Sequence, residues 1–158
     1  MIFQPIHIPS VDHESERTEN AAKGFSLLAS ATIAEVFAST GGPQAAGFYA
    51  AIGRRIATHV ELDGATETEA LVARMNALWG ALGWGSARLE LGDDAVLIHH
   101  HDMPQDIYGD LDGRWLEAAA ALLEGAYDAW FCSLISDRTL QTQFIGWNRG
   151  VAELRYGH

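Results

Sequence analysis

The sequence is poor in cysteine and in positive charge. Among 158 residues there is one cysteine, Cys132, so no disulfide can form within the chain. Lys and Arg number 10, with Lys23 the only lysine, against 21 Asp and Glu, and the formal charge is −11. Nucleic-acid binding needs clustered cations that replace phosphate counterions, and an anionic membrane surface repels such a chain. The composition therefore argues against nucleic acid and membrane surfaces as partners.

Long apolar runs are also missing. No segment reaches the roughly 18 to 20 uninterrupted apolar residues that a membrane-spanning helix needs. Residues 1–10 contain no Lys or Arg and no long apolar run, unlike a secretory signal. We therefore expect a protein that does not span a membrane and that resides in the cytoplasm.

The chain is nevertheless apolar overall, with 48% hydrophobic and 20% charged residues, which is typical of a folded domain. We expect an N-terminal arm over residues 1–23 and a single domain over residues 24–158. In the arm, Pro5 and Pro9 favour extended backbone, and acidic residues follow with little apolar periodicity. Several apolar residues accompany them, so the arm is either free in solution or held against a partner.

Helical spacing begins at about Asn20. Apolar residues then recur at steps of three and four along one predicted face: Phe25, Leu28, Thr32, Ile33, Val36 and Phe37. The run Gly41-Gly42-Pro43 predicts the end of this helix and the start of a second one. A third helix is predicted to begin at a capping box formed by Thr66 and Glu69.

After the third helix the apolar period changes from about 3.6 residues to 2. Residues 87–91 and 95–101 predict a hairpin that turns at residues 92–94. A long helix over residues 115–134 and a second hairpin over residues 140–156 follow. The sequence thus predicts an α+β fold, in which three N-terminal helices precede a hairpin–helix–hairpin unit. About four antiparallel strands form a small sheet packed on the helices.

The histidine run His99–His101 is the first candidate for metal chemistry. Alternate residues of a strand share a face, so His99 and His101 form an H-x-H pair. His59, Asp102 or Asp106 are conceivable third ligands, but no second metal motif accompanies the pair. We predict no metal site and no cofactor, and interpret the three histidines as the end of an exposed strand.

The sequence lacks the common motifs for catalysis. There is no G-x-S-x-G and no P-loop. The acidic loop over residues 102–113 is interpreted as negative charge ahead of a helix N-terminus, which the helix dipole favours. Cys132 lies among aromatic and leucine residues, which favours a buried structural thiol over a nucleophile. The protein is therefore predicted not to be an enzyme and to have no catalytic residues.

Glycine and tryptophan suggest close packing. Each glycine inside a helix costs roughly 0.5–1 kcal/mol relative to alanine, and a close backbone approach, within the subunit or between subunits, would offset this cost. Five tryptophans and the apolar excess favour a protein–protein surface. The predicted oligomer interface consists of Gly47, Gly53, Trp79, Gly80, Gly83 and Trp84.

Residues 75–85, MNALWGALGWG, resemble the LNALLGxxxWG segment of the bacterial cellulose synthase D-subunit family. The strand at residues 88–91 is similar to the family's KLEL-like strand. In the next segment, residues 95–104, His100 stands at the family's strand-end His and Pro104 at the Pro that follows it. Residues 113–116 and 122–130 are similar to the family's GxWLxxxLEGLYxxW helix. These matches occur in the family's order over more than a third of the chain. The arm and the chain after Leu134 match only in the order of elements.

The resemblance implies a non-catalytic accessory subunit. Proteins of this family assemble into ring-shaped octamers, built as tetramers of dimers, with channels lined partly by N-terminal arms. They are expected either to guide or align nascent β-1,4-glucan chains or to hold synthase complexes in register, so that the chains crystallise together. The implied partners are glucan chains, the cellulose synthase complex and its accessory proteins, and the candidate glucan contacts are Phe3, Gln4 and His7. An exported polymer makes the periplasm the alternative to a cytoplasmic location at the inner-membrane complex.

Two other functions stay open at the level of sequence. A helix and sheet of this layout can enclose a small ligand, with His59 or His100 binding haem or a metal in a sensor domain. A glycan hydrolase is the third hypothesis. It would use the acidic residues of the predicted turns, Asp93, Asp94, Asp102 and Asp106.

Overall fold

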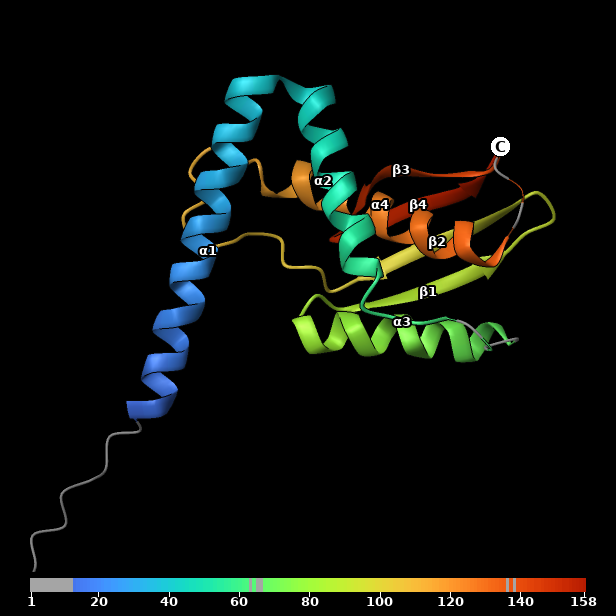
Figure 1. The fold of residues 1–158 in the computed structure, drawn as a ribbon, viewed down its shortest axis with the longest axis horizontal. Helices are drawn as coiled ribbons and strands as arrows, with labels where there is room; N and C mark the ends of the chain where they lie inside the picture. The colour runs from blue at the N-terminus through green and yellow to red at the C-terminus, as the bar shows by residue number, and fades with distance from the viewer. Residues whose placement is uncertain (1–12, 63, 65–66, 136, 138) are drawn as a thin grey trace, which may run out of the picture.

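The computed structural model describes residues 13–62, 64, 67–135, 137 and 139–158. Three helices come first, followed by a hairpin, a long helix and a second hairpin (Figure 1). This order confirms the predicted α+β fold. The elements are α1 (His13–Thr40), α2 (Gly42–Ala57), α3 (Thr68–Leu82), β1 (Ser86–Leu91), β2 (Ala95–His101), α4 (Trp115–Leu134), β3 (Gln141–Asn148) and β4 (Val151–Gly157).

The four strands form one antiparallel sheet in the order β1-β2-β4-β3. The two hairpins therefore meet at the centre, where Ile98 of β2 faces Leu154 of β4 and both are fully buried. The edge strands are β1 and β3, and a bulge between Phe144 and Gly146 interrupts the ladder of β3. Residues alternate along each strand, so one face of the sheet enters the core.

Helix α4 is the centre of the fold. It lies between α2 and the sheet (Figure 1), and twelve of its twenty residues are buried. A helix with neighbours on opposite sides needs apolar residues around most of its circumference. The alanine-rich run 118–121 and the leucine and aromatic residues after it supply them.

Two glycines allow α2 and α4 to touch backbone to backbone. A Cβ on Gly53 of α2 would lie 1.9 Å from the carbonyl oxygen of Leu122, and a Cβ on Gly125 of α4 would lie 2.0 Å from that of Ala50. Neither position has room for any side chain. Of the two explanations for helix glycines, close approach within the subunit is therefore the one that applies to Gly53.

Helix α1 begins at His13, seven residues before the predicted start at Asn20, and so includes the second half of the predicted arm. Residues 13–20 are polar around the whole helix and carry no apolar period, which is why spacing did not reveal them. Glu14 and Glu16 lie in the first turn, where negative charge stabilises a helix. The N-terminal half of α1 projects away from the rest of the protein (Figure 1).

The elbow between α1 and α2 consists of one residue. Gly41 has φ of 81°, a left-handed conformation that favours glycine, and Pro43 follows at the start of α2. The amide of Gly41 donates to the carbonyl of Phe37 at 3.3 Å, and Ala45 donates to the carbonyl of Gly41 at 3.0 Å. The predicted break at residues 41–43 is confirmed. The predicted capping box rests on Thr66, which lies outside the described residues, and Glu67 is the N-cap of α3.

Candidate functional site

His100 lies in the core and not at the end of an exposed strand. Its side chain is fully buried, with Nδ1 2.7 Å from the Tyr127 hydroxyl and Nε2 2.6 Å from the Trp84 carbonyl oxygen. A carbonyl only accepts, so Nε2 carries the proton and Nδ1 accepts from the Tyr127 hydroxyl. Burial lowers the pKa of His100 to about 4, so the ring is neutral at neutral pH.

This network fastens three elements together. His100 belongs to β2, Tyr127 to α4, and Trp84 to the turn between α3 and β1. The ring of Trp79 packs edge-on against His100 at 5.2 Å between centroids, and burial raises the pKa of Tyr127. Both ring nitrogens of His100 are engaged within the protein. It is therefore a structural residue and has no nitrogen left for haem or a metal.

The other two histidines of the run lie on the opposite, polar face of the sheet. His99 Nε2 is 3.6 Å from Glu90 Oε2, and a hollow of about 390 Å³ is lined by His99, His101, Asn148, Arg149, Val151 and Glu153. His59 and Asp102 are exposed elsewhere. Within the described residues, no three His, Cys, Asp or Glu side chains are grouped so as to hold a metal ion. The sensor hypothesis thus finds no convergent ligands in this part of the chain.

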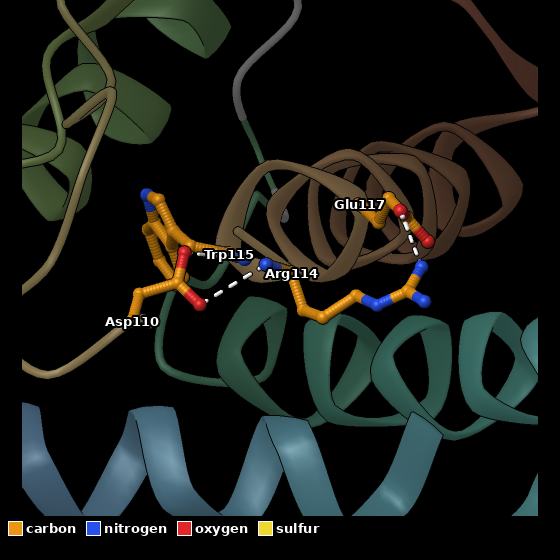
Figure 2. Close-up of polar contacts among 4 residues, drawn as sticks. All are labelled: Asp110, Arg114, Trp115 and Glu117. Atoms are coloured by element: carbon orange, nitrogen blue, oxygen red, sulfur yellow. Dashed lines mark hydrogen bonds and ion pairs between the residues drawn. The ribbon is translucent and has the colours of Figure 1, made fainter. Parts of the chain in front are cut away.

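The acidic loop holds the N-terminus of α4 through one residue, Asp110. Its two carboxylate oxygens each accept a backbone N–H at 3.0 Å, from Arg114 and from Trp115 (Figure 2). The indole of Trp115 donates to the carbonyl oxygen of Pro104 at 2.7 Å. Arg114 donates to Glu117 at 2.8 Å and its guanidinium lies 5.3 Å from the ring centroid of Phe37. The predicted role of the loop is confirmed, although the sequence did not identify which acid performs it.

An apolar surface is exposed along α1. Ser30 and Ile33 are its only buried side chains among those described, whereas Phe25 is 72% and Leu28 65% exposed. The predicted apolar face is therefore split, with Ile33 directed into the protein and Phe25 and Leu28 directed outward. Large exposed apolar side chains that cluster mark interaction sites. We define the α1 surface as the exposed apolar residues of this helix, Phe25, Leu27 and Leu28.

The loop that carries Tyr108 and Leu111 lies against a different side of α1, at Ser26 and Ser30. The hydroxyls of Ser26 and Ser30 each donate to the Tyr108 carbonyl oxygen at 3.3 Å. A Cβ on Gly109 would lie 2.7 Å from side-chain atoms of Leu27 and Ser30. Leu111, at 96% exposure, ends the segment. This contact holds α1 to a loop that lies 82 residues further along the chain.

Helix α1 also bears on the prediction that the chain has no membrane-spanning segment. Over Glu14–Thr40 it is long and apolar enough to cross a membrane, and the most apolar part of it is only 11% buried. Buried core helices and signal sequences share these properties. The criterion of an uninterrupted apolar run did not detect this helix, because single polar residues lie between its apolar ones.

The predicted interface residues lie in three settings: buried in the subunit, half-buried, and exposed at its surface. Trp79 is fully buried and Gly53 contacts α4, so both belong to the interior of the subunit. Trp84 is half-buried and stacks on Trp79 at 6.2 Å between ring centroids. Three glycines lie at the surface with no atom within 4 Å of an added Cβ, namely Gly47, Gly80 and Gly83.

Two further predictions concern single side chains. Cys132 is exposed and not buried, because it lies on the outward side of α4 while Trp130 and Phe131 turn inward. Its aromatic neighbours in sequence were a poor guide, since successive helix residues are about 100° apart. The predicted glucan contacts Phe3, Gln4 and His7 lie outside the described residues.

Comparison with known proteins gives two kinds of similarity. The family of the D subunit of cellulose synthase matches residues 12–157. One protein described as "Cellulose synthase operon protein D" from Komagataeibacter xylinus is 33% identical over 119 residues, which are 73% of this chain and 74% of that protein. A second protein with the same description and organism is 34% identical over 85 residues, 52% of this chain and 53% of its own length.

Proposed function

Because the chain belongs to the cellulose synthase D-subunit family and so has a role in cellulose synthesis, we propose that it is a non-catalytic subunit that assembles with copies of itself through the α1 surface. The assembly is a closed ring of eight copies, as a tetramer of dimers. It holds nascent β-1,4-glucan chains in register so that they crystallise together. Its partners are these chains, the cellulose synthase complex and the other accessory proteins.

The observation that supports this proposal is the exposure of α1. A projecting helix with Phe25 and Leu28 in water is unfavourable for an isolated subunit, because each square ångström of apolar surface kept in water costs about 25 cal/mol. Contact with a second copy removes that surface from water. A ring built as a tetramer of dimers needs two kinds of contact, and we propose that the α1 surface supplies one of them.

The mass in solution tests the assembly. We expect the wild-type protein near eight times 17.1 kDa by light scattering, and a smaller species for the Phe25→Ser/Leu28→Ser variant. Leu91→Ser is the matched control, since Leu91 is 63% exposed on β1 outside the α1 surface, and it should keep the wild-type mass. A wild-type protein near 17.1 kDa at micromolar concentration would contradict the proposal.

The arm supplies the proposed contacts with glucan. Phe3 offers a ring for stacking on a sugar face, and Gln4 and His7 offer hydrogen bonds to hydroxyl groups. The Phe3→Ala/Gln4→Ala/His7→Ala variant should keep the ring mass but reduce the crystallinity of cellulose made by cells, measured by X-ray diffraction of the fibre. Unchanged fibre crystallinity would reject the arm as the contact.

The proposed location is the cytoplasmic side of the inner-membrane cellulose synthase complex, with the periplasm as the alternative. Protease added to spheroplasts distinguishes the two sides, because it reaches a periplasmic protein and spares a cytoplasmic one.

A subunit without catalytic activity is expected to release no reducing sugar from cellulose oligomers.

A further inference from the structure

Helix side chains form hydrogen bonds with backbone groups on both edge strands of the sheet. An edge strand normally presents unpaired N–H and C=O groups on which another strand can pair. At the β1 edge, the Asn76 amide of α3 takes the place of a neighbouring strand. Its Nδ2 donates to the Ala87 carbonyl oxygen at 3.0 Å, and its Oδ1 accepts the Ala87 N–H at 2.7 Å.

The β3 edge is closed by two carboxylates of α4. The N–H of Thr142 donates to Asp128 Oδ1 at 2.9 Å, and the N–H of Phe144 donates to Glu124 Oε2 at 2.7 Å. Residues two apart on a strand direct their N–H groups to the same side, here away from β4. Their separation of about 6.6 Å is close to the rise of about 6 Å between helix residues four apart. The two elements are therefore matched in spacing.

Strand β3 has few other features that would prevent another strand from pairing with it. Its sequence, QTQFIGWN, contains no charged residue and no proline, which are the usual protection of an exposed edge. The other edge strand, β1, carries Arg88 and Glu90. The bulge at Phe144/Gly146 interrupts the ladder of β3, which resumes at Gly146. The longest uninterrupted stretch of this edge is therefore residues 141–144, where both carboxylates act.

We propose that Glu124 and Asp128 close the β3 edge against strand addition by a second copy of this chain. The occupant they exclude is the partner copy's own β3, running antiparallel about a two-fold axis, because identical edges are complementary in that arrangement. Self-association is thereby directed away from the sheet and to the helical surfaces. The inference rests on the sheet contacts alone and does not depend on the mass of the ring.

The first test is amide hydrogen exchange by NMR in the Phe25→Ser/Leu28→Ser background, which separates the edge from any α1 association. Before any further change, the Thr142 and Phe144 amides should exchange slowly although they lie on an edge strand. Asp128→Ala should accelerate exchange of Thr142 at least tenfold, and Glu124→Ala that of Phe144, each without the other. Rapid exchange of both amides before substitution, or no response to either substitution, would overturn the proposal.

The second test is association. The Glu124→Ala/Asp128→Ala variant should form dimers and larger species that increase with protein concentration, whereas Glu124→Gln/Asp128→Asn should not, because its amide oxygens still accept the two N–H groups. Glu117→Ala is the control for charge loss on the same helix. An alanine variant that is folded by circular dichroism and keeps the background mass at all concentrations would refute the proposal. Association of the Gln/Asn variant equal to that of the alanine variant would also refute it. If the double alanine variant does not fold, the single substitutions decide the matter by amide exchange.

Discussion

Helices α1 and α4 are both long and apolar, and they end in opposite surroundings. Twelve of the twenty residues of α4 are buried, whereas only Ser30 and Ile33 are buried among the described side chains of α1. The sheet covers one side of α4 and α2 covers the other. Helix α1 has α2, the start of α4 and the loop at Tyr108 along one side of its C-terminal half. Apolar content therefore predicts that a helix has a partner, and neighbours in the fold decide whether the partner lies within the subunit.

Adding one methyl group should disrupt the close contact of α4 with α2. Gly125→Ala places a methyl group 2.0 Å from the Ala50 carbonyl oxygen, so the two helices must separate. We expect a loss of about 3 kcal/mol or more in the free energy of unfolding, measured by urea denaturation. Gly47→Ala on α2 is the control, since its added Cβ meets no atom within 4 Å, and it should gain about 0.5–1 kcal/mol. Equal stability of the two variants would contradict the contact.

The contact of α4 with the sheet is sensitive to pH through His100. Its pKa is about 4 in the folded protein against 6.5 when unperturbed, because burial disfavours the charged ring. Above pH 6.5 the ring is neutral in both states. Between 6.5 and 4 the unfolded state binds the proton and the folded state does not, so stability falls as pH falls, by about 3 kcal/mol in total.

The measurement is the urea midpoint across this range for the wild type and for His100→Asn. The variant loses the imidazole, so its free energy of unfolding should decline less between pH 6.5 and 4, by about 3 kcal/mol. Other titrating groups are common to both proteins and cancel in the difference. Parallel profiles would show that His100 is not neutral in the folded core.

The first turn of α4 is capped by the carboxylate of Asp110. Asp110→Ala should cost about 1–2 kcal/mol, because two backbone N–H groups lose their acceptor. Asp110→Asn keeps one acceptor oxygen and should cost less. Thermal unfolding of both variants makes the measurement, and an alanine variant as stable as the wild type would remove Asp110 from this role.

The smallest effect is expected on the exposed side of α1. Phe25→Ser/Leu28→Ser should change the unfolding free energy of the dissociated subunit by about 0.5 kcal/mol or less, since both side chains are already in water. Ile33→Ala, on the buried side of the same helix, should cost about 2–4 kcal/mol. Denaturation at low protein concentration separates the two, and similar losses would mean that Phe25 and Leu28 pack inside the subunit.

Local patterns in the sequence were enough for the order of elements. The change of apolar period located both hairpins and α4, and Gly41-Gly42-Pro43 located the break after α1. Periodicity did not reveal the polar start of α1 at His13. It also grouped Phe25 with Ile33, because spacing shows which residues are near one another on a helix and not which side meets the core.

The properties of single side chains depended on distant residues. His100 is buried and its neighbours His99 and His101 are not, although the three are chemically identical. The difference comes from Tyr127 and Trp84, which only the fold brings to His100. The same holds for Glu124 and Asp128, since their partners on β3 lie 20 and 14 residues further along the chain.

Gly41 is the single residue between α1 and α2, so its backbone angles set the angle between the two helices. Helix α1 is 28 residues long and reaches roughly 42 Å, so turning it by about 10° at Gly41 would swing its far end by roughly 7 Å. Only one residue separates the two helices. The direction of α1 is therefore set by the backbone angles of Gly41 and by the packing of Ser30 and Ile33 against the rest of the subunit. The far end is His13, 28 residues before Gly41, so the conformation of this one glycine sets where the N-terminal end of α1 lies.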